Sequence, residues 1–377
     1  MRSSYREDDV IFLLKDITGM VKPQPAQERE REIQAGRHYC EMLPLEYVPT
    51  PAYMEAYREG LAHYAGATAQ AVGVLADKIM EKKGSQAVLV SLARAGTPVG
   101  ILLKRYILRK YQAEVKHYSI SIIRGRGIDH NAMKFLLEIY EAKRLLFVDG
   151  WIGKGAILGE LKKELAAYPG VSDEIAVLAD PAGVTDLCGT HEDILIPSSC
   201  LNGTVSGLVS RTFLRDDIIG AHDFHGAVYY EEMEREDLSY DFIEAIEREF
   251  DCYPSAAKGK TENFPEDWKY SAPVSRKLCP NGSTEGKRAE NAGLQEVRAI
   301  GRKFGISDIN LIKPGIGETT RVLLRRIPWK ILISSCCRED RSLAHILKLA
   351  QEKQVPVEYY PLEHYKACGI IKKLADT

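Results

Sequence analysis

An uninterrupted apolar run that leads directly into an acidic residue and a glycine-rich turn, at residues 144–157, constrains the fold more than any other feature. Residues 145–148 are all apolar, as in a strand buried on both faces of a parallel sheet. Asp149 would then lie at the carboxyl edge of the sheet, where open α/β sheets bind ligands. The glycines let backbone N–H groups approach an anion, and the following helix adds the positive end of its dipole. The stretch therefore predicts an anion site at a strand-to-helix junction.

A second unit of the same kind lies earlier in the chain. Residues 87–91 form another apolar run, and the turn after it contains Arg94, Ala95 and Gly96 before a helix begins. The further strand candidates are residues 116–122, 175–179 and 194–196, and residues 53–82 have the apolar spacing of a long helix. Strands that alternate with helices in this way predict an α/β domain built on a parallel sheet with helices on both faces.

The two turns and the basic segment between them, residues 116–130, together resemble type I phosphoribosyltransferases. In that family the first turn binds the diphosphate of phosphoribosyl pyrophosphate, the second holds its ribose and 5-phosphate, and a flexible basic segment covers the site. The resemblance implies a catalytic set of Asp149, Arg94, Arg124 and Arg126. It implies that the substrate is held by Ala95, Gly96, Asp149, Gly153, Lys154, Gly155 and Ala156. Mg²⁺ would bind through the diphosphate of the substrate rather than through the protein.

Residues 199–212 and 223–227 are similar to a divergent branch of that family associated with bacterial tellurite-resistance stress operons. The resemblance implies an enzyme that transfers ribose 5-phosphate to an unidentified acceptor and makes a nucleoside-like or nucleotide product in a stress response. The chain departs from the common family pattern at Gly150, where a second acid is usual. Asn202, Ser206 and Arg211 also suit a site in this region, although a hydrogen-bonded turn accounts for them better.

The same branch is also catalogued as the cysteine protease family StiP, so a second enzyme class stays open. A thiol nucleophile needs a base nearby to form the thiolate. Cys200 with His225 or His222 as base, and Asp223 to orient the base, is the candidate grouping. A buried structural cysteine explains Cys200 better than catalysis does. A third alternative is a non-catalytic RNA binder that senses nucleotides.

Composition narrows the class of protein. The 377 residues suffice for two domains, and a hydrophobic fraction of 45% with 28% charged residues is usual for a globular protein. No apolar run approaches the roughly 20 residues that span a bilayer, and the first ten residues are too polar for a secretory signal. A cytoplasmic protein with reduced thiols is therefore expected, without a membrane partner. The eight cysteines lack zinc-site spacing, which predicts no structural metal, and a homo-oligomer is compatible with the sequence.

The chain is predicted to divide into four parts. Residues 1–40 form an N-terminal extension, 41–250 the phosphoribosyltransferase-like domain, 251–288 a linker rich in Pro, Gly, Ser and Lys, and 289–377 a second domain. The last part holds 15 Lys and Arg against 10 Asp and Glu, a net charge of +5, whereas the first 288 residues carry −7. A basic excess on a small domain is compatible with nucleic acid as a partner.

The pattern of residues 289–377 predicts a small α/β/α sandwich. Residues 294–304 have one apolar helical stripe, 343–350 are helical, and 309–312, 331–333 and 355–359 read as strands. The glycine-rich turn at 313–326, the stretch 355–361 and the ACG at 367–369 resemble the ribosomal L7Ae and Pelota RNA-binding domains. The resemblance implies that RNA is bound through Lys313, Gly317, Glu318, Thr319, Arg321 and Arg325.

Overall fold

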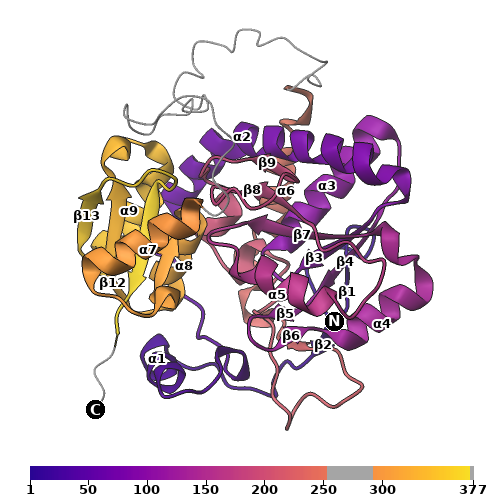
Figure 1. Cartoon of the computed structure of the whole chain (residues 1–377), viewed down its shortest axis with the longest axis horizontal. Coiled ribbons are helices and arrows are strands. Elements are labelled where there is room, and N and C mark those ends of the chain that lie inside the picture. The colour runs from indigo at the N-terminus through magenta and orange to yellow at the C-terminus, as the bar shows by residue number, and fades with distance from the viewer. Residues whose placement is uncertain (253–291, 374–377) are drawn as a thin grey trace.

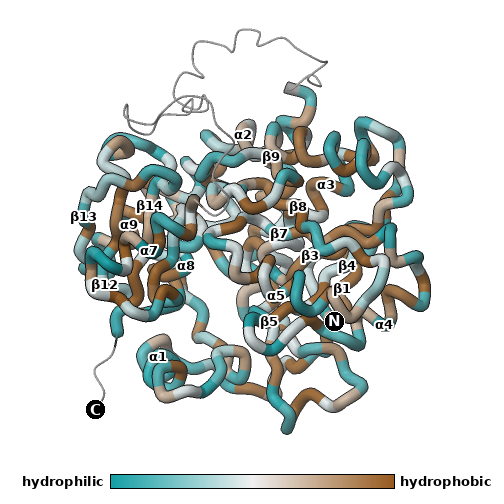
Figure 2. The backbone as a smooth tube through the Cα atoms, in the orientation of Figure 1, coloured by the Kyte–Doolittle hydropathy of each residue, from teal (hydrophilic) through white to brown (hydrophobic). Residues whose placement is uncertain are grey.

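The computed structural model describes residues 1–252 and 292–373, so nearly all of the linker predicted over 251–288 lies outside the described residues. Two α/β bodies lie side by side (Figure 1), one built on a six-stranded sheet and the other on a four-stranded sheet. Hydrophobic residues gather along the strands and hydrophilic residues on the outer turns (Figure 2). None of the described helices combines the length and apolar character that crossing a bilayer demands.

The large sheet is parallel throughout. Its order is β1 (Ile11–Phe12), β4 (Lys116–Ile120), β3 (Val88–Leu92), β7 (Leu145–Trp151), β8 (Ile175–Ala179) and β9 (Cys188–Thr190). The predicted parallel sheet is thus confirmed, and β3, β4, β7 and β8 fall where the apolar runs placed them. The strand predicted over 194–196 is wrong, because these residues are an unpaired segment before a 3-10 turn, η4 (Pro197–Cys200). The last strand is instead β9.

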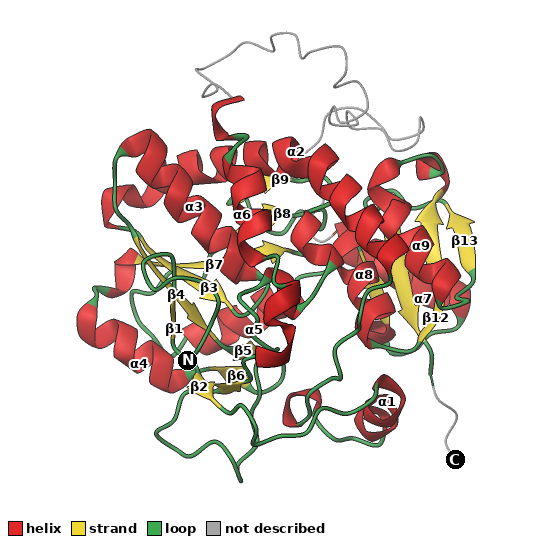
Figure 3. Cartoon of the chain, turned by 180° about the vertical axis from the view of Figure 1, so that it is seen from behind, coloured by secondary structure: helices red, strands yellow, loops and turns green. Residues whose placement is uncertain are grey.

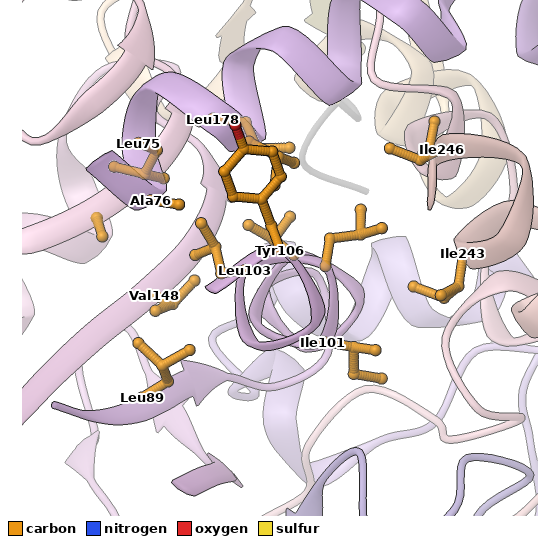
Figure 4. Close-up of a cluster of buried hydrophobic side chains, with 14 of the residues drawn as sticks. Leu75, Ala76, Leu89, Ile101, Leu103, Tyr106, Val148, Leu178, Ile243 and Ile246 are labelled. Carbon is orange, nitrogen blue, oxygen red and sulfur yellow. The ribbon is translucent and has the colours of Figure 1, made fainter. Parts of the chain in front are cut away.

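Side chains that alternate along each strand supply a separate core to each face of this sheet. Leu89 and Val148 point toward α2 (Pro51–Lys83), α3 (Gly96–Tyr111) and α6 (Ser239–Glu247), as Figure 4 shows. Val90 and Phe147 point to the other face, which is covered by α4 (His130–Ile139) and α5 (Ala156–Leu165). Helices on both faces are seen from behind in Figure 3. This is the burial that near-continuous apolar strands require.

The two predicted anion turns meet at one point of this sheet. Strand β3 lies next to β7, and the helices that follow these strands cover opposite faces of the sheet. The chain therefore leaves the carboxyl ends of β3 and β7 in opposite directions and opens a crevice between them. Crevices at such topological switch points are the usual ligand sites of open α/β sheets.

The small sheet has the order β11 (Ile312–Pro314), β14 (Ala367–Ile371), β12 (Pro328–Ser334) and β13 (Val357–Tyr360). Helices α8 (Ile316–Arg325) and α9 (Ala344–Glu352) pack on one face, and α7 (Ala292–Phe304) packs on the other. The predicted strand over 309–312 is mostly a 3-10 turn, η9 (Ile309–Leu311), and β11 begins only at its last residue.

The first 40 residues connect the two bodies. Besides edge strand β1, they form β2 (Lys15–Asp16), which pairs with β10 (Gly226–Ala227), and α1 (Ala26–Gln34). In Figure 1, α1 lies beside the small domain. Its buried Glu30 accepts a hydrogen bond of 2.6 Å from Arg326, an ion pair that holds α1 against α8. The N-terminal segment thus packs against both domains.

Candidate active site and domain interface

A cavity of about 190 Å³ lies at the switch point of the large sheet. Arg94 and Ala95 reach it from the turn after β3, Asp149 from the end of β7, and Arg321 and Arg325 from α8 of the small domain. Gly96 packs closely against β7, because a side-chain carbon at this position would come within 2.4 Å of a carbonyl oxygen of that strand. The two predicted anion turns are therefore brought together, and the small domain covers them.

A second cavity of about 270 Å³ shares much of this wall, and we call the two together the interdomain chamber. Its own lining includes Arg29 of α1, Arg124 of the segment between β5 (Ile122–Ile123) and β6 (Gly127–Ile128), and Lys313 of β11. The residues common to both cavities are Tyr39, Asp149, Trp151, Ile157, Arg211, Arg321 and Arg325. Asn202, Ser206 and Arg211, which sequence placed in a turn, line the first cavity.

The turn predicted to hold a 5-phosphate is occupied in part by the small domain. The Lys154 ammonium donates hydrogen bonds to the carbonyls of Ile309 and Ile312, so its charge serves the domain interface. The Gly153 carbonyl accepts from the Tyr365 hydroxyl at 2.7 Å. Gly155 and Ala156 still line the second cavity. The turn is therefore a docking surface as well as a cavity wall.

Arg94 and Asp149 differ in how their charges are compensated. The Arg94 guanidinium donates to Glu46 at 3.2 Å and to the Val209 carbonyl at 2.8 Å, and both charged side chains are buried. Asp149 accepts a hydrogen bond from the Gly150 amide at 2.8 Å. Burial raises the pKa of Asp149 to about 6, although the nearby Arg321 charge opposes the shift. Thus Arg94 is neutralised by a partner, whereas Asp149 has no ion pair within the described residues.

The predicted RNA-binding residues of α8 mostly face the large domain instead of solvent. The Arg321 guanidinium lies 4.3 Å from the centroid of the Trp151 ring and donates to Glu318 at 2.7 Å. Gly317 packs against the same ring, since a side-chain carbon there would come within 2.3 Å of an indole carbon. Arg325 donates to the Asn202 amide oxygen at 2.6 Å. The structure thus places these predicted RNA-binding residues against the large domain, and their contact with RNA stays a prediction. Thr319, also predicted to bind RNA, is fully buried.

The segment predicted as a flexible cover is built into the sheet structure. Residues 116–130 form β4 and the short antiparallel pair β5 and β6. Arg124 donates to the Asn310 side chain at 3.0 Å, and Arg126 forms an ion pair of 2.7 Å with Glu41. The two predicted cover cations therefore tether neighbouring segments, although Arg124 also lines the chamber.

The predicted grouping of Cys200 with His225 is not formed. Cys200 is 1% exposed and lies in an apolar cluster with Tyr53 and Leu323, and burial raises the pKa of its thiol well above the ordinary value. The His225 ring instead contacts the Ser121 hydroxyl at 2.8 Å, and its amide donates to Asp129. Each predicted partner is thus engaged elsewhere. Asp223, the predicted orienting acid, pairs with Lys15 at 2.6 Å.

Two other thiols of the described residues lie against histidine rings. The Cys188 sulfur is 3.5 Å from one ring nitrogen of His191 and 3.7 Å from the other. A hydrogen bond in the plane of the ring approaches one nitrogen, so near-equal distances are a poor geometry for proton transfer. The adjacent Asp180 carboxylate accepts from three backbone amides, which makes it part of a turn.

The second pair, His38 and Cys40, has the geometry of a nucleophile and its base. The His38 Nδ1 atom lies 2.9 Å from the Cys40 sulfur, and the Nε2 atom lies 3.1 Å from the Arg124 carbonyl oxygen. A carbonyl only accepts, so Nε2 carries the proton and Nδ1 is an acceptor. The Cys40 backbone amide also donates to Nδ1, at 3.4 Å, and the Cys40 thiol lies 3.5 Å from the Leu214 carbonyl oxygen, to which it can donate. Burial raises the pKa of Cys40 to about 11, against the charges of Arg126 and Arg211, and burial lowers the pKa of His38.

Sequence reasoning did not identify this pair. Its only signal is a histidine and a cysteine two residues apart at 38–40, inside the predicted N-terminal extension. Tyr39, the residue between them, lines both cavities of the chamber, and the Arg211 guanidinium lies 4.3 Å from the centroid of its ring. The thiol pair therefore flanks a residue of the chamber wall, although His38 and Cys40 are not themselves among the lining residues.

Comparisons with known proteins cover almost the whole chain. Residues 3–247 match the family model described as tellurite-like stress resistance cysteine protease StiP. A curated protein of Acinetobacter baylyi (strain ATCC 33305 / BD413 / ADP1), named cysteine protease StiP, is 31% identical over 388 residues, which cover 98% of this chain and 94% of that protein. The chain belongs to the StiP family. Residues 291–373 match a PELOTA RNA binding domain, so the small domain of this StiP family member is of the Pelota type.

The membership corrects the predicted reaction. The prediction of an enzyme that uses phosphoribosyl pyrophosphate is wrong, because both the family model and the curated relative name a cysteine protease. The open alternative, a cysteine hydrolase, is better supported, and the association with tellurite-type stress resistance is confirmed. The error has a physical origin: a strand, an acid and a glycine turn specify a crevice at a sheet edge, and many chemistries use such crevices. The predicted Mg²⁺, which was to be carried by that substrate, stays untested.

Proposed function

We propose that this StiP family member is a cysteine peptidase in which Cys40 is the nucleophile and His38 the general base. The observation that carries the proposal is the 2.9 Å contact between the Cys40 sulfur and the His38 Nδ1 atom, with the opposite ring nitrogen held by a backbone carbonyl. A base within hydrogen-bond reach of the thiol, itself oriented by a third group, is the arrangement that activates a thiol nucleophile.

The reaction follows from these contacts. His38 accepts the thiol proton at Nδ1, and the Cys40 thiolate attacks the carbonyl carbon of a peptide bond. The tetrahedral oxyanion collapses, the C–N bond breaks, and the amine leaves with the proton from His38. Water, deprotonated by the same imidazole, then hydrolyses the thioester and regenerates the thiol. The Arg124 carbonyl supports the imidazolium that forms transiently, and Arg126 and Arg211 favour the thiolate.

Substrate access requires a local movement. Cys40 is fully buried, whereas His38 and Tyr39 are partly exposed. Cys40 lies in a short 3-10 turn, η1 (Tyr39–Glu41), which His38 caps at its N-terminus and whose outer residue Glu41 is held by the ion pair with Arg126. Release of this one turn would expose the thiol without disturbing either sheet, and turns of this kind are among the least stable parts of a fold.

Three matched cysteine variants test the proposal. Cys40→Ser should abolish hydrolysis of an unfolded, fluorescently labelled casein, whereas Cys188→Ala and Cys200→Ala should retain it. His38→Ala should lower the rate by about 10²- to 10⁴-fold, the usual contribution of a general base. Thermal unfolding of each variant separates loss of chemistry from loss of fold. Full activity in Cys40→Ser, or its loss only in Cys200→Ala, would refute this nucleophile.

We also propose that the Pelota-type domain binds RNA. The family match supports this function, and the basic residues of α8 and β11 supply the charge that phosphates need. Because these residues face the large domain, RNA reaches them at the chamber. The test is fluorescence anisotropy of a single-stranded RNA at several salt concentrations, in which Arg325→Gln should weaken binding and reduce the salt dependence by about one counterion. An unchanged affinity and slope would exclude α8.

We also propose the specific architecture of the large domain and its location in the cell. The parallel sheet covered on both faces, with its switch point between β3 and β7, supports the type I phosphoribosyltransferase architecture for the large domain as a matter of fold alone. A cytoplasmic location suits a chain whose proposed nucleophile must stay reduced. Fractionation of producing cells would test the location.

A further inference from the structure

The interdomain chamber holds more positive charge than its carboxylates compensate. Within the described residues, no carboxylate lies at ion-pair distance from Lys154, Lys313 or the guanidinium groups of Arg29, Arg211 and Arg325. The neighbouring acids already have arginine partners, namely Glu46 with Arg94, Glu318 with Arg321 and Glu30 with Arg326. Asp149 is the remaining acid on the wall that both cavities share.

The uncompensated cations converge from four parts of the chain. Arg29 comes from α1, Arg211 from the loop before β10, Lys313 from β11 and Arg325 from α8, and all four line the second cavity. Their closeness has an electrostatic consequence. Burial, together with the charges of Arg211 and Arg326, lowers the pKa of Arg29 to about 10. Like charges gathered in a partly enclosed cavity are a binding site for a multiply charged anion.

Within the part of the chain that the structure describes, three buried polar groups on residues that line the chamber have no hydrogen-bond partner, and one of them is the Ser199 hydroxyl. The Nε atom of Arg29, a side chain that is 1% exposed, has no hydrogen-bond partner, and neither has the Nε1 atom of Trp151. Buried N–H groups are normally paired, so an orphaned donor in a functional cavity marks the place of an absent acceptor. Two of the three are N–H donors and the Ser199 hydroxyl can also donate, so a ligand rich in acceptor oxygens would satisfy all of them.

We propose that the interdomain chamber binds the terminal phosphate of a single RNA strand, with the guanidinium groups of Arg29, Arg211 and Arg325 and the indole N–H of Trp151 as donors. The inference rests on the RNA-binding part of the proposed function and names the part of the RNA that is recognised. It gives both domains a share in one ligand, because Arg325 belongs to the small domain and Trp151 to the large one.

The charge of the ligand distinguishes an RNA end from an internal phosphate. A terminal phosphomonoester carries about −1.5 to −2 at neutral pH, whereas an internal phosphodiester carries a single charge. Planar guanidinium groups also match phosphate oxygens in pairs. The cavities of about 190 and 270 Å³ are each smaller than a usual small-molecule pocket, which favours a compact group such as a single phosphate. A strand end can enter such a space, while a duplex cannot.

The experiment compares three versions of one ten-nucleotide RNA by anisotropy with the full chain at fixed salt: 5′-phosphorylated, 3′-phosphorylated, and with hydroxyls at both ends. At least one phosphorylated form should bind about tenfold or more tightly than the hydroxyl form. Arg29→Gln and Arg211→Gln should each remove this preference and leave hydroxyl RNA bound. Arg302→Gln, an exposed cation of α7, is the matched control and should keep the preference.

The other outcomes separate the proposals. Equal binding of all three RNAs would overturn the terminal-phosphate site and leave RNA binding intact. No binding of any RNA would overturn both. Adenosine monophosphate and inorganic phosphate are added as competitors, and displacement by either at the concentration at which the RNA itself half-saturates would assign the chamber to a free phosphate compound instead. Because loss of fold would mimic loss of binding, Arg325→Lys, which keeps the charge, should retain part of the preference.

Discussion

Burial sets the protonation state of the groups on which both proposals depend. It raises the pKa of the Cys40 thiol and lowers the pKa of His38, so the pair rests as a neutral thiol and a neutral imidazole. It also raises the pKa of Asp149 above that of an ordinary carboxyl group. In each case the charged form loses more hydration than its neighbours restore. These shifts lead to two predictions that a titration can check.

The first concerns alkylation of Cys40 by iodoacetamide, followed for its own peptide by mass spectrometry. With a thiol pKa of about 11, the thiolate fraction rises about tenfold for each pH unit between 7 and 10. The alkylation rate should follow, without a plateau in that range. Arg211→Gln removes a neighbouring cation and should slow the reaction further at every pH. A plateau already at neutral pH would instead show a preformed thiolate and imidazolium pair.

The second concerns Asp149 and the affinity of the chamber for phosphorylated RNA. Above pH 6 the carboxylate is ionised and repels the phosphate, whereas below pH 6 it is neutral. Asp149→Asn should therefore bind about three- to tenfold more tightly than the natural chain at pH 7.5, an electrostatic effect reduced by solvent. The two affinities should converge as the pH falls to 5. The comparison at each pH cancels the titration of the phosphate itself.

The exposed carboxylate variant Asp216→Asn is the control for this titration and should match the natural chain at every pH. A constant ratio between Asp149→Asn and the natural chain from pH 5 to 7.5 would contradict the assigned role of Asp149.

At the scale of elements, the sequence predicts a strand well where helices bury both faces of that strand. The apolar run at 145–148 became the centre of β7, because a central parallel strand is covered on both faces. The strand prediction for residues 194–196 was wrong because this segment has no pairing partner. Its middle residue packs instead in the apolar cluster beneath the small domain. Strand β9, of sequence CGT, was missed because an edge strand of three small residues has no apolar pattern.

Helix α8 docks on the large domain through a glycine, which gives an element-scale prediction. A methyl group at Gly317 would lie 2.3 Å from the Trp151 ring, so Gly317→Ala should destabilise the fold by about 1–3 kcal/mol. Gly159→Ala in α5 is the same change at a helical position with nothing within 4 Å of the new carbon. It should stabilise by about 0.4–1 kcal/mol. Urea denaturation measures both, and equal effects of the two variants would show that α8 does not dock as described.

At the scale of the molecule, sequence alone located the site residues of each domain, but it did not predict that the two sets of residues line one cavity. Asp149 and Arg94 were assigned to one crevice and Arg321 and Arg325 to an RNA surface, and the structure puts all four on one wall. Local patterns report which residues lie at a sheet edge or a helix start. Local patterns do not predict which face of one domain packs against the other. That packing depends on shape complementarity, such as the contact of Gly317 with Trp151.

The buried carboxylate of Asp193 shows how firmly the two domains are joined. It belongs to the large domain and accepts hydrogen bonds from the backbone amides of Ile316, at the start of α8, and Lys366, before β14. A helix whose N-terminal N–H is satisfied by another domain loses that partner when the domains part. The interface is therefore expected to make the unfolding of the two domains a single cooperative event.

Two tryptophans serve as probes: Trp329 in β12 reports on the small domain, and Trp151 in β7 reports on the large domain together with its contact with α8. In variants that keep one of them and replace the other two tryptophans by Phe, urea should give the same fluorescence midpoint for both probes. Asp193→Ala removes the shared cap, at a cost of about 0.5–2 kcal/mol, and should move the Trp329 midpoint below that of Trp151. Asp193→Asn retains an acceptor oxygen and should separate them less. Midpoints that differ already in the natural interface would mean that the domains fold independently, and that the chamber between them opens without cost to either.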